Sequence, residues 1–335
     1  MNTELTSIFG LTKVETRVLF SLEDWLTRID IDSTEDDSDA DRKTKWLQKW
    51  EENLFRKSFF GLIGESPPQS EKDIIKRIQT IKDPRKRLLI VSESLVFTPY
   101  FNIQHRDSAH LQQTVNEANR KVWRTNVFKF AKKVDLDKSI LEQWESRYED
   151  SLRAIGGRSD VWKKATVVAL ATVTVAVTGG LAAPVIGGAI GAAMGLSGAA
   201  ATSAGLAFLG GGAIATGGAG MAGGTLAIIG GGAILGGAGG LTATRHFFLQ
   251  HKVVLTQLAK LDASLLTLYE DHSELPSLLN TVIEQQLSVL RDLNKEIETP
   301  NLENDDKKRL EKTASYYKES IKRLNKLHLE KSGLN

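Results

Sequence analysis

Apolar residues recur at steps of three and four near the end of the chain, which is the period of an α-helix. Residues 245–332 carry three such stripes, with Pro276 and Pro300 between them. The stripes are Val254, Leu258, Leu261, Leu265 and Leu268; Leu279, Ile283, Gln286, Leu290, Leu293 and Ile297; and Leu310, Ala314, Tyr317, Ile321 and Leu324. This heptad spacing predicts two or three antiparallel, coiled-coil-like helices. They can pack on each other, on the N-terminal part or on a second copy, and packing within the chain is favoured because each stripe is only about three heptads long.

Residues 1 to about 160 show the same helical period in shorter pieces. Aromatic residues spaced among charges are the expected core of this part: Trp25, Trp46, Trp50, Phe55, Phe59, Trp123, Phe128 and Trp144. Proline pairs at 67–68, 83–84 and 98–99 interrupt the pattern, so short helices are expected. From Asn119, Val122, Val127, Phe130 and Val134 lead to Asp135 as a candidate N-cap. The helix after it has the buried-face pattern Leu141, Trp144, Tyr148, Leu152, Ile155 and is expected to end at Gly156-Gly157.

An acidic run interrupts the first part, with seven acids in the twelve residues from Asp30 to Asp41. A calcium loop needs Gly at its sixth position and an acid at its twelfth. Counted from Asp37, those positions hold Arg42 and Gln48. The run is therefore expected to be a solvated linker.

The middle of the chain contains no charge at all. Residues 165–244 are 80 consecutive uncharged residues, and 23 of the 29 glycines lie among them. All 43 basic and 41 acidic residues lie outside this uncharged block. At the charge density of the rest of the chain, a stretch of this length would carry roughly 26 charges, so a physical cause is required.

A lipid bilayer is the cause that fits best. A hydrocarbon core of about 30 Å takes about 20 helical residues, so the block has the length of two to four crossings. Lys163 and Lys164 precede it, and Arg245, His246 and Lys252 follow it. Cationic flanks favour the cytoplasmic side at both ends, which requires an even number of crossings, and two are expected. The segment 165–184 offers only five Val and two Leu. These side chains favour insertion of the segment into a bilayer by a free energy of only roughly 2 to 4 kcal/mol. The block is therefore expected to insert weakly, which allows a soluble form before insertion.

Glycines four residues apart give the block a way to associate. The membrane helix packing residues are expected to be Gly187, Gly191, Gly195, Gly220, Gly224, Gly232, Gly236 and Gly240. Faces without side chains let helix backbones approach closely in lipid, where no hydrophobic effect drives pairing. The alternative is a flexible Gly/Ala low-complexity segment.

Composition and motifs narrow the function classes. The chain has 335 residues, no Cys and a formal charge of +2, which favours neither a disulfide scaffold nor a nucleic-acid-binding protein. The start of the chain has no signal-peptide pattern. Gly218, Gly220 and Gly223 match a dinucleotide fingerprint only in letters, and the next acid, Asp262, lies 39 residues beyond. The six His residues have no metal-ligand spacing. No catalytic, cofactor or metal site is expected.

Part of the chain resembles a family of transmembrane and coiled-coil proteins that carry an α/β-hydrolase domain. The resemblance spans about residues 119–240 and rests on the helical stretch NRKVWRTNVFKFAKKVDLDKSILEQWESRYEDSL, on Trp162-Lys163-Lys164, on TGGLAAPVIGGAIGAAMG and on the later Gly-Gly-rich apolar run. In that family the Gly-rich block implies a membrane segment. The chain has no GxSxG motif, so the resemblance does not bring hydrolase activity with it.

These patterns predict an all-α protein with a helical domain over 1–160, a Gly-zipper membrane hairpin over 161–244 and coiled-coil-like helices over 245–335. The leading hypothesis is a homo-oligomeric protein of the cytoplasmic membrane, with both termini cytosolic, that permeabilises the lipid bilayer as a pore-forming toxin or antiviral defence effector does. The alternative is a constitutive membrane-anchored scaffold whose helical arms bind a protein partner. A third class, an enzyme acting through Ser203, would lose esterase activity on Ser203→Ala, and none is expected.

Overall fold

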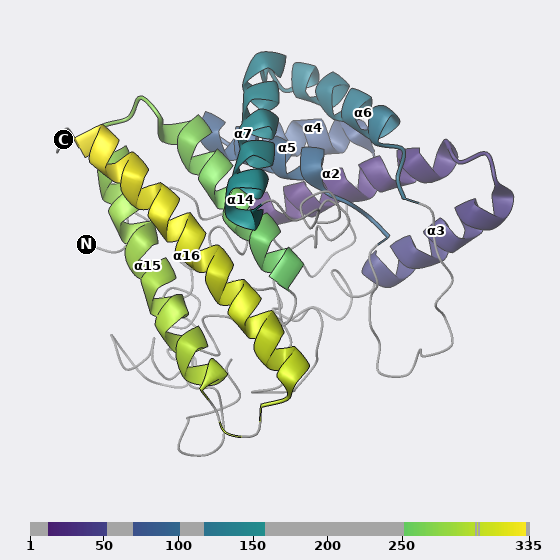
Figure 1. The fold of residues 1–335 in the computed structure, drawn as a ribbon. Helices are drawn as coiled ribbons and strands as arrows, with labels where there is room; N and C mark the ends of the chain where they lie inside the picture. Colours follow the sequence, from purple (N-terminus) through teal and green to yellow (C-terminus); the bar gives the residue numbers. More distant parts are fainter. Residues whose placement is uncertain are drawn as a thin grey trace, which may run out of the picture. The chain divides into compact units, whose positions relative to one another are not determined.

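The computed structural model describes residues 13–51, 70–100, 117–157, 251–298, 300 and 302–332. Within these ranges the chain forms α-helices and no strands, which confirms the predicted all-α class (Figure 1). The described helices fall into two compact units, and the division lies inside one helix, between Glu145 and Ser146. The predicted domain boundaries near 160 and 245 lie outside the described residues and stay predictions.

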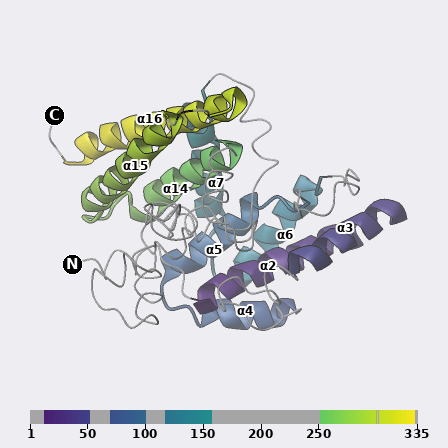
Figure 2. The same cartoon turned by 90° about the horizontal axis from the view of Figure 1, so that it is seen from below.

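The N-terminal unit comprises the described residues up to Glu145. Its helices are α2 (Lys13–Asp32), α3 (Asp37–Glu51), α4 (Glu71–Gln79), α5 (Pro84–Val96), α6 (Arg120–Lys133) and the start of α7 (Lys138–Gly156). The central helix is α2, which packs against α3, α4, α5 and α6 (Figure 2).

Short helices follow from the capping chemistry, as the prolines predict. The side chain of Ser70 accepts a hydrogen bond from the amide of Asp73 and begins α4. Asp83 caps α5, and Pro84 takes its first position, where a missing N–H costs nothing. Asn119 caps α6 through the amide of Val122.

The core of this unit forms around α5 and a line of aromatic rings. Every residue from Leu88 to Val96 is buried, so α5 is enclosed on all sides. The rings of Trp46 and Trp50 on α3 are stacked, with 5.9 Å between their centroids. The ring centroid of Phe97 lies 5.8 Å from that of Trp50 and 5.8 Å from that of Trp123. These rings join α3, the end of α5 and α6. Among the other expected core aromatics, Trp144 is buried, Trp25 and Phe128 are partly exposed, and Phe55 and Phe59 lie outside the described residues.

The boundary between α6 and α7 differs from the predicted one. Asp135 is not an N-cap: it lies just after α6 with a positive φ of 58°, a conformation that ends a helix. Asp137 does the capping instead, since its carboxylate accepts from the amide of Ser139 at 2.8 Å. The rest of the prediction is confirmed, because the five apolar residues from Leu141 to Ile155 are buried and α7 ends at Gly156 with Gly157 at φ 73°.

The C-terminal unit combines the end of α7 with α14 (His251–Tyr269), α15 (Leu275–Ile297) and α16 (Asn304–Ser332). The three apolar stripes lie on these three helices, which confirms the predicted helices. Helix α16 packs against both α15 and α14, and α15 and α16 run side by side in Figures 1 and 2. All five residues of the last stripe are buried, as packing within the chain requires.

Polar side chains join the end of α7 to this bundle. The hydroxyl of Ser151 donates to the buried carboxylate of Asp262, which also pairs with Arg323 of α16. Arg147, four residues before Ser151 on α7, pairs with Glu270, the residue after α14. Asp262 is 2 % exposed, so its two partners offset the cost of burying its charge.

Gln286 breaks the apolar stripe of α15 and generates a prediction. Its side chain is buried, yet neither amide atom has a hydrogen-bond partner. Burying an unpaired amide is unfavourable, so Gln286→Leu is expected to raise the free energy of unfolding by about 1 to 3 kcal/mol in urea denaturation. Asn280→Leu, at an exposed position of the same helix, is the control and should stay within about 0.5 kcal/mol of wild type. A loss of stability in the Gln286 variant would show that the amide has a partner in solution.

Candidate functional site

Most of the predicted membrane residues lie outside the described part of the chain. These are Lys163, Lys164, Gly187, Gly191, Gly195, Gly220, Gly224, Gly232, Gly236, Gly240 and Arg245. Lys252 is the exception, since it lies in the first turn of α14. No helix within the described ranges combines the length and the hydropathy that a membrane crossing needs.

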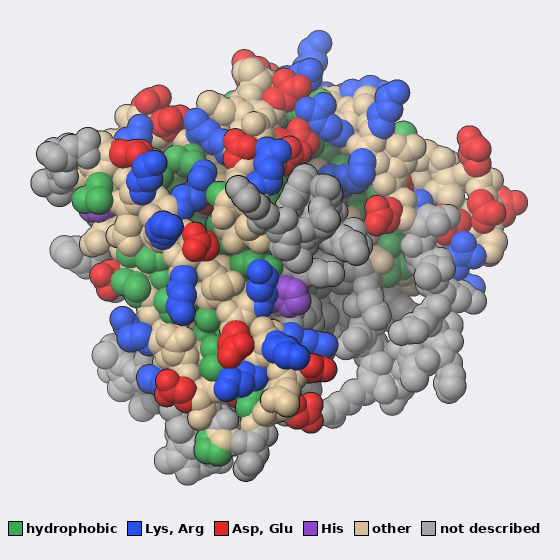
Figure 3. Space-filling view, viewed as in Figure 1, with side chains coloured by type: hydrophobic (Ala, Val, Ile, Leu, Met, Phe, Trp, Pro, Cys, Tyr) green, Lys and Arg blue, Asp and Glu red, His purple; other side chains and the backbone are tan. Residues whose placement is uncertain are grey.

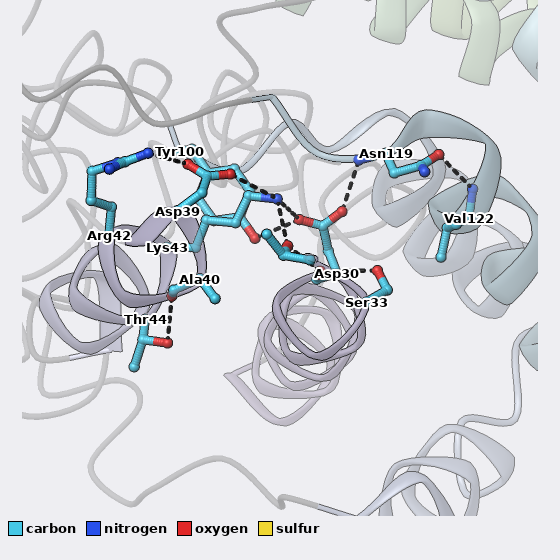
Figure 4. A network of polar contacts seen from close by, with 11 residues as sticks. Asp30, Ser33, Asp39, Ala40, Arg42, Lys43, Thr44, Tyr100, Asn119 and Val122 are labelled. Atoms are coloured by element: carbon cyan, nitrogen blue, oxygen red, sulfur yellow. Dashed lines mark hydrogen bonds and ion pairs between the residues drawn. The ribbon is translucent and has the colours of Figure 1, made fainter. Parts of the chain in front are cut away.

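The described residues instead bring together a buried polar network around Asp30, which we call the Asp30 network (Figure 4). It consists of Asp30 from the end of α2, Thr34 from the turn after it, Asp39 and Lys43 from α3, Tyr100 after α5, and the backbone of Asn119 at the start of α6. This corrects the expectation for the acidic run. Asp30 and Asp39 are each 2 % exposed and lie on helices, so only the few residues between α2 and α3 form a linker.

Asp30 receives three hydrogen bonds of 2.8 Å from three different segments. Lys43 Nζ and the Tyr100 hydroxyl both donate to Oδ2, and the backbone N–H of Asn119 donates to Oδ1. Because Asn119 is the N-cap of α6, this last bond places the start of that helix directly against α2.

Lys43 makes two hydrogen bonds and one longer ionic contact within the network. Its ammonium group donates to Asp30, donates to Thr34 at 3.0 Å and lies 3.8 Å from the carboxylate of Asp39. It also lies 5.0 Å from the ring centroid of Tyr100. Two of its N–H donors thus have hydrogen-bonded oxygens, and the Asp39 carboxylate lies beyond hydrogen-bonding distance but close enough for an ionic attraction.

Tyr100 has an unfavourable backbone conformation. Its backbone has φ 68°, in the left-handed region that is unfavourable for a bulky side chain. Burial, followed by the nearby Asp30 carboxylate, raises the pKa of its hydroxyl. The hydroxyl therefore acts as a hydrogen-bond donor only. With an ion-paired amine, a carboxylate that accepts three hydrogen bonds and a phenol that acts as a donor, the network fixes helices in place.

A second ionic cluster joins the same two helices one turn away. Arg28 bonds Asp24 at 2.9 Å and also pairs with Glu51, the last residue of α3. Asp24 is fully buried, and 27 % of the Glu51 side chain is exposed. Burial and the adjacent Asp24 raise the pKa of Glu51 to about 7, while Arg28 opposes this shift. This group therefore titrates near neutrality.

Sequence reasoning missed both clusters, although one local signal was present. Lys43 stands four residues after Asp39, the spacing of an ion pair on one helix face. The partners that bury the pair are Tyr100 and Asn119, 70 and 89 residues from Asp30, and no local pattern connects them.

Comparisons with protein-family models, curated proteins and solved structures find no match for this chain. The resemblance to transmembrane and coiled-coil proteins thus stays an expectation from sequence.

Breaking the Asp30 network should destabilise the N-terminal unit strongly. Asp30→Asn leaves Lys43 buried with its main partner neutralised, and we expect a loss of about 3 to 5 kcal/mol in the free energy of unfolding, measured by urea denaturation. Adding Lys43→Met removes the unpaired charge and should recover part of that loss. Lys45→Met, at an exposed position of α3, is the control and should change stability by less than about 0.5 kcal/mol. Equal losses in the single and double variants would contradict the proposed coupling.

Glu51 should make stability fall as pH rises. Its pKa is higher in the folded chain than the ordinary value of 4.5, so the folded state binds more protons between about pH 4.5 and 7, and the stabilisation is lost as pH rises through 7. Glu51→Gln removes this titration. We expect the variant to match wild type at pH 5 and to exceed it at pH 8 by on the order of 1 kcal/mol, after allowing for solvent screening. Glu35→Gln, in the exposed turn, should keep the wild-type pH dependence.

Proposed function

We propose that this protein inserts its uncharged block into a lipid bilayer, oligomerises there and permeabilises the membrane. The observation that carries the proposal is the run of 80 residues without a single charge, in a chain where a quarter of all residues are charged. A charged side chain at a bilayer centre costs about 2.5 to 3.5 kcal/mol on insertion scales, whereas a surface loop in water gains from charge. A lipid environment is the condition that excludes charge over such a length.

The strength of the block favours conditional insertion. Its first 20 residues contain five Val and two Leu, whose combined drive is roughly 2 to 4 kcal/mol before Gly and Thr reduce it. Glycine also weakens an isolated helix by up to about 1 kcal/mol per residue relative to Ala. Such helices need lipid or each other, and the glycines at four-residue spacing provide close contact between them.

The described helices support this proposal by lying on both sides of the block in the sequence. Helices α2 to α7 precede it, and α14 to α16 follow it. The helices of each unit pack against one another and carry many charges. This is the build expected of soluble arms around a membrane segment.

The test is expression in a bacterium, with carbonate-washed membranes and a membrane-potential dye followed during induction. The wild-type chain should remain in the washed membranes and the potential should collapse. Gly191→Leu with Gly236→Leu places bulk on both glycine faces and should preserve the potential at equal expression, because the helices no longer approach closely.

Ala193→Leu with Ala238→Leu is the matched control. Each alanine lies two residues beyond a substituted glycine, roughly 200° around a helix, so the same bulk faces the other side. This variant should retain the leak. Membrane retention with an intact potential in the wild-type chain would favour the anchored scaffold, and a wild-type chain found only in the soluble fraction would overturn the proposal.

A further inference from the structure

Helix α6 has an exposed surface of one charge sign. Its exposed residues are Arg120, Lys121, Thr125, Lys129, Lys132 and Lys133, and the whole helix contains no acid. The opposite side holds Trp123, Val127, Phe130 and Ala131, all buried. At 100° per residue, Lys121, Thr125, Lys129 and Lys132 fall within an arc of roughly 80° that faces away from the core. We call these four residues the α6 basic face.

The two arginines of α6, Arg120 and Arg124, lie beside this face and have partners within the unit. Arg120 donates to the carbonyls of Leu95 and Phe97, both at 2.8 Å, and so caps the end of α5. Arg124 pairs with Glu142 and Glu145 of α7.

Lys133 lies 2.7 Å from Glu71 of α4, and it is favourably placed near the negative end of the helix dipole. Among the described residues, no ion pair involves Lys121, Lys129 or Lys132. The nearest acids along the chain are Glu117 before the helix and Asp135 after it. These three lysines are therefore not explained by contacts within the unit.

Two of these lysines are unfavourably placed for an isolated helix, whereas Lys132 lies in the last turn, where the helix dipole favours a positive charge. Lys121 lies in the first turn, where the helix dipole disfavours a positive charge. Lys129 repels Lys132 and Lys133, which lie three and four residues away on the same side. A stripe of like charges that weakens its own helix is better explained by an anionic partner outside the chain.

An aromatic residue borders the face and suits a membrane surface. Phe128 is partly exposed, with the Arg124 guanidinium 4.4 Å and the Lys138 ammonium 5.5 Å from its ring centroid. Lysines together with a partly exposed aromatic ring are the composition of helices that lie in the headgroup region of anionic bilayers.

We infer that the α6 basic face binds the anionic headgroups of a lipid bilayer and holds the chain at the surface. The choice of a lipid partner rests on the proposed function, since the uncharged block begins at Ala165, 33 residues after Lys132. Nucleic acid fits less well, because the chain as a whole carries a formal charge of only +2 and the face offers three lysines.

The test is flotation of the purified full-length chain with vesicles of pure phosphatidylcholine or with 30 % phosphatidylglycerol. Protein released by 0.5 M NaCl measures surface binding, and protein that resists carbonate measures insertion. Lys121→Gln, Lys129→Gln and Lys132→Gln together should lower the salt-released partition coefficient on anionic vesicles about a hundred-fold, since one lysine near such a surface contributes about five-fold. Each single variant should lose about five-fold, and the three Lys→Arg changes together should keep the binding.

Helix α16 offers the matched control, because its charges are mixed. Acidic and basic side chains are interspersed along it on the face in Figure 3. Lys308, Lys322 and Lys326 are exposed and have Glu311, Glu319 and Glu330 three or four residues away. Changing these three lysines to Gln removes the same charge from the chain, and binding should fall by no more than a few-fold because nearby acids already offset them.

The outcomes separate this inference from the proposed function. Equal binding to neutral and anionic vesicles, equal losses in the two triple variants, or binding to duplex DNA in place of vesicles would overturn the α6 assignment, even where carbonate-resistant insertion persists. Salt-released binding that depends on the α6 lysines, with no carbonate-resistant protein, would support the assignment and overturn insertion. Circular dichroism melts of both triple variants should match wild type or lie above it, because the substituted lysines are exposed.

Discussion

The N-terminal unit depends on one buried carboxylate. The carboxylate of Asp30 accepts hydrogen bonds from Lys43 of α3, from the hydroxyl of Tyr100 after α5 and from the backbone N–H of Asn119, the N-cap of α6. A single side chain therefore fixes where three other segments meet α2. The strained backbone of Tyr100 is a consequence, because its hydroxyl reaches Asp30 from a left-handed conformation. Hydrophobic burial alone would not impose such geometry, since apolar contacts have no direction. The aromatic rings from Trp46 to Trp123 contribute buried apolar surface, and Asp30 fixes the positions of the helices relative to one another.

The helical units contain buried acidic and basic side chains, whereas the uncharged block contains none. The two helical units bury acidic and basic side chains such as Lys43, Asp30 and Asp262, because each finds partners at short range that offset the loss of water. The block between them contains none in 80 residues. A segment in the bilayer core has few polar partners available and no water, so the same side chains would stay uncompensated there. The contrast is what the proposed insertion of the block into a bilayer requires.

Periodicity predicted most of the helices, and it failed where partners are distant in sequence. The helices α14, α15 and α16 could be predicted because the apolar residues of their buried faces recur every three or four positions along the sequence. Gly157 likewise marked the end of α7, since only a residue tolerant of positive φ fits there. The acidic run was misread because acids next to each other suggest solvent, while the residues that bury Asp30 lie as far as 89 positions away. Asp135 was misread as a cap for a related reason: Asp suits both a helix start and a left-handed helix end, and Asp137 two residues later took the first role.

If the proposed insertion and the proposed binding of the α6 basic face both occur, two weak membrane affinities in one chain act together more strongly than either alone. The basic face acts through Coulomb forces that extend about 10 Å at ordinary salt, so it can select an anionic surface before any apolar contact forms. The block acts only once it touches hydrocarbon, and its own drive is a few kcal/mol. Once the face holds the chain at the surface, insertion becomes an intramolecular step with a high effective concentration, and the entropy of bringing protein to membrane is not lost a second time. Under this proposal a weak inserter is sufficient, and its weakness has an advantage: the block would stay out of neutral membranes, and the charge of the lipid would decide where insertion begins.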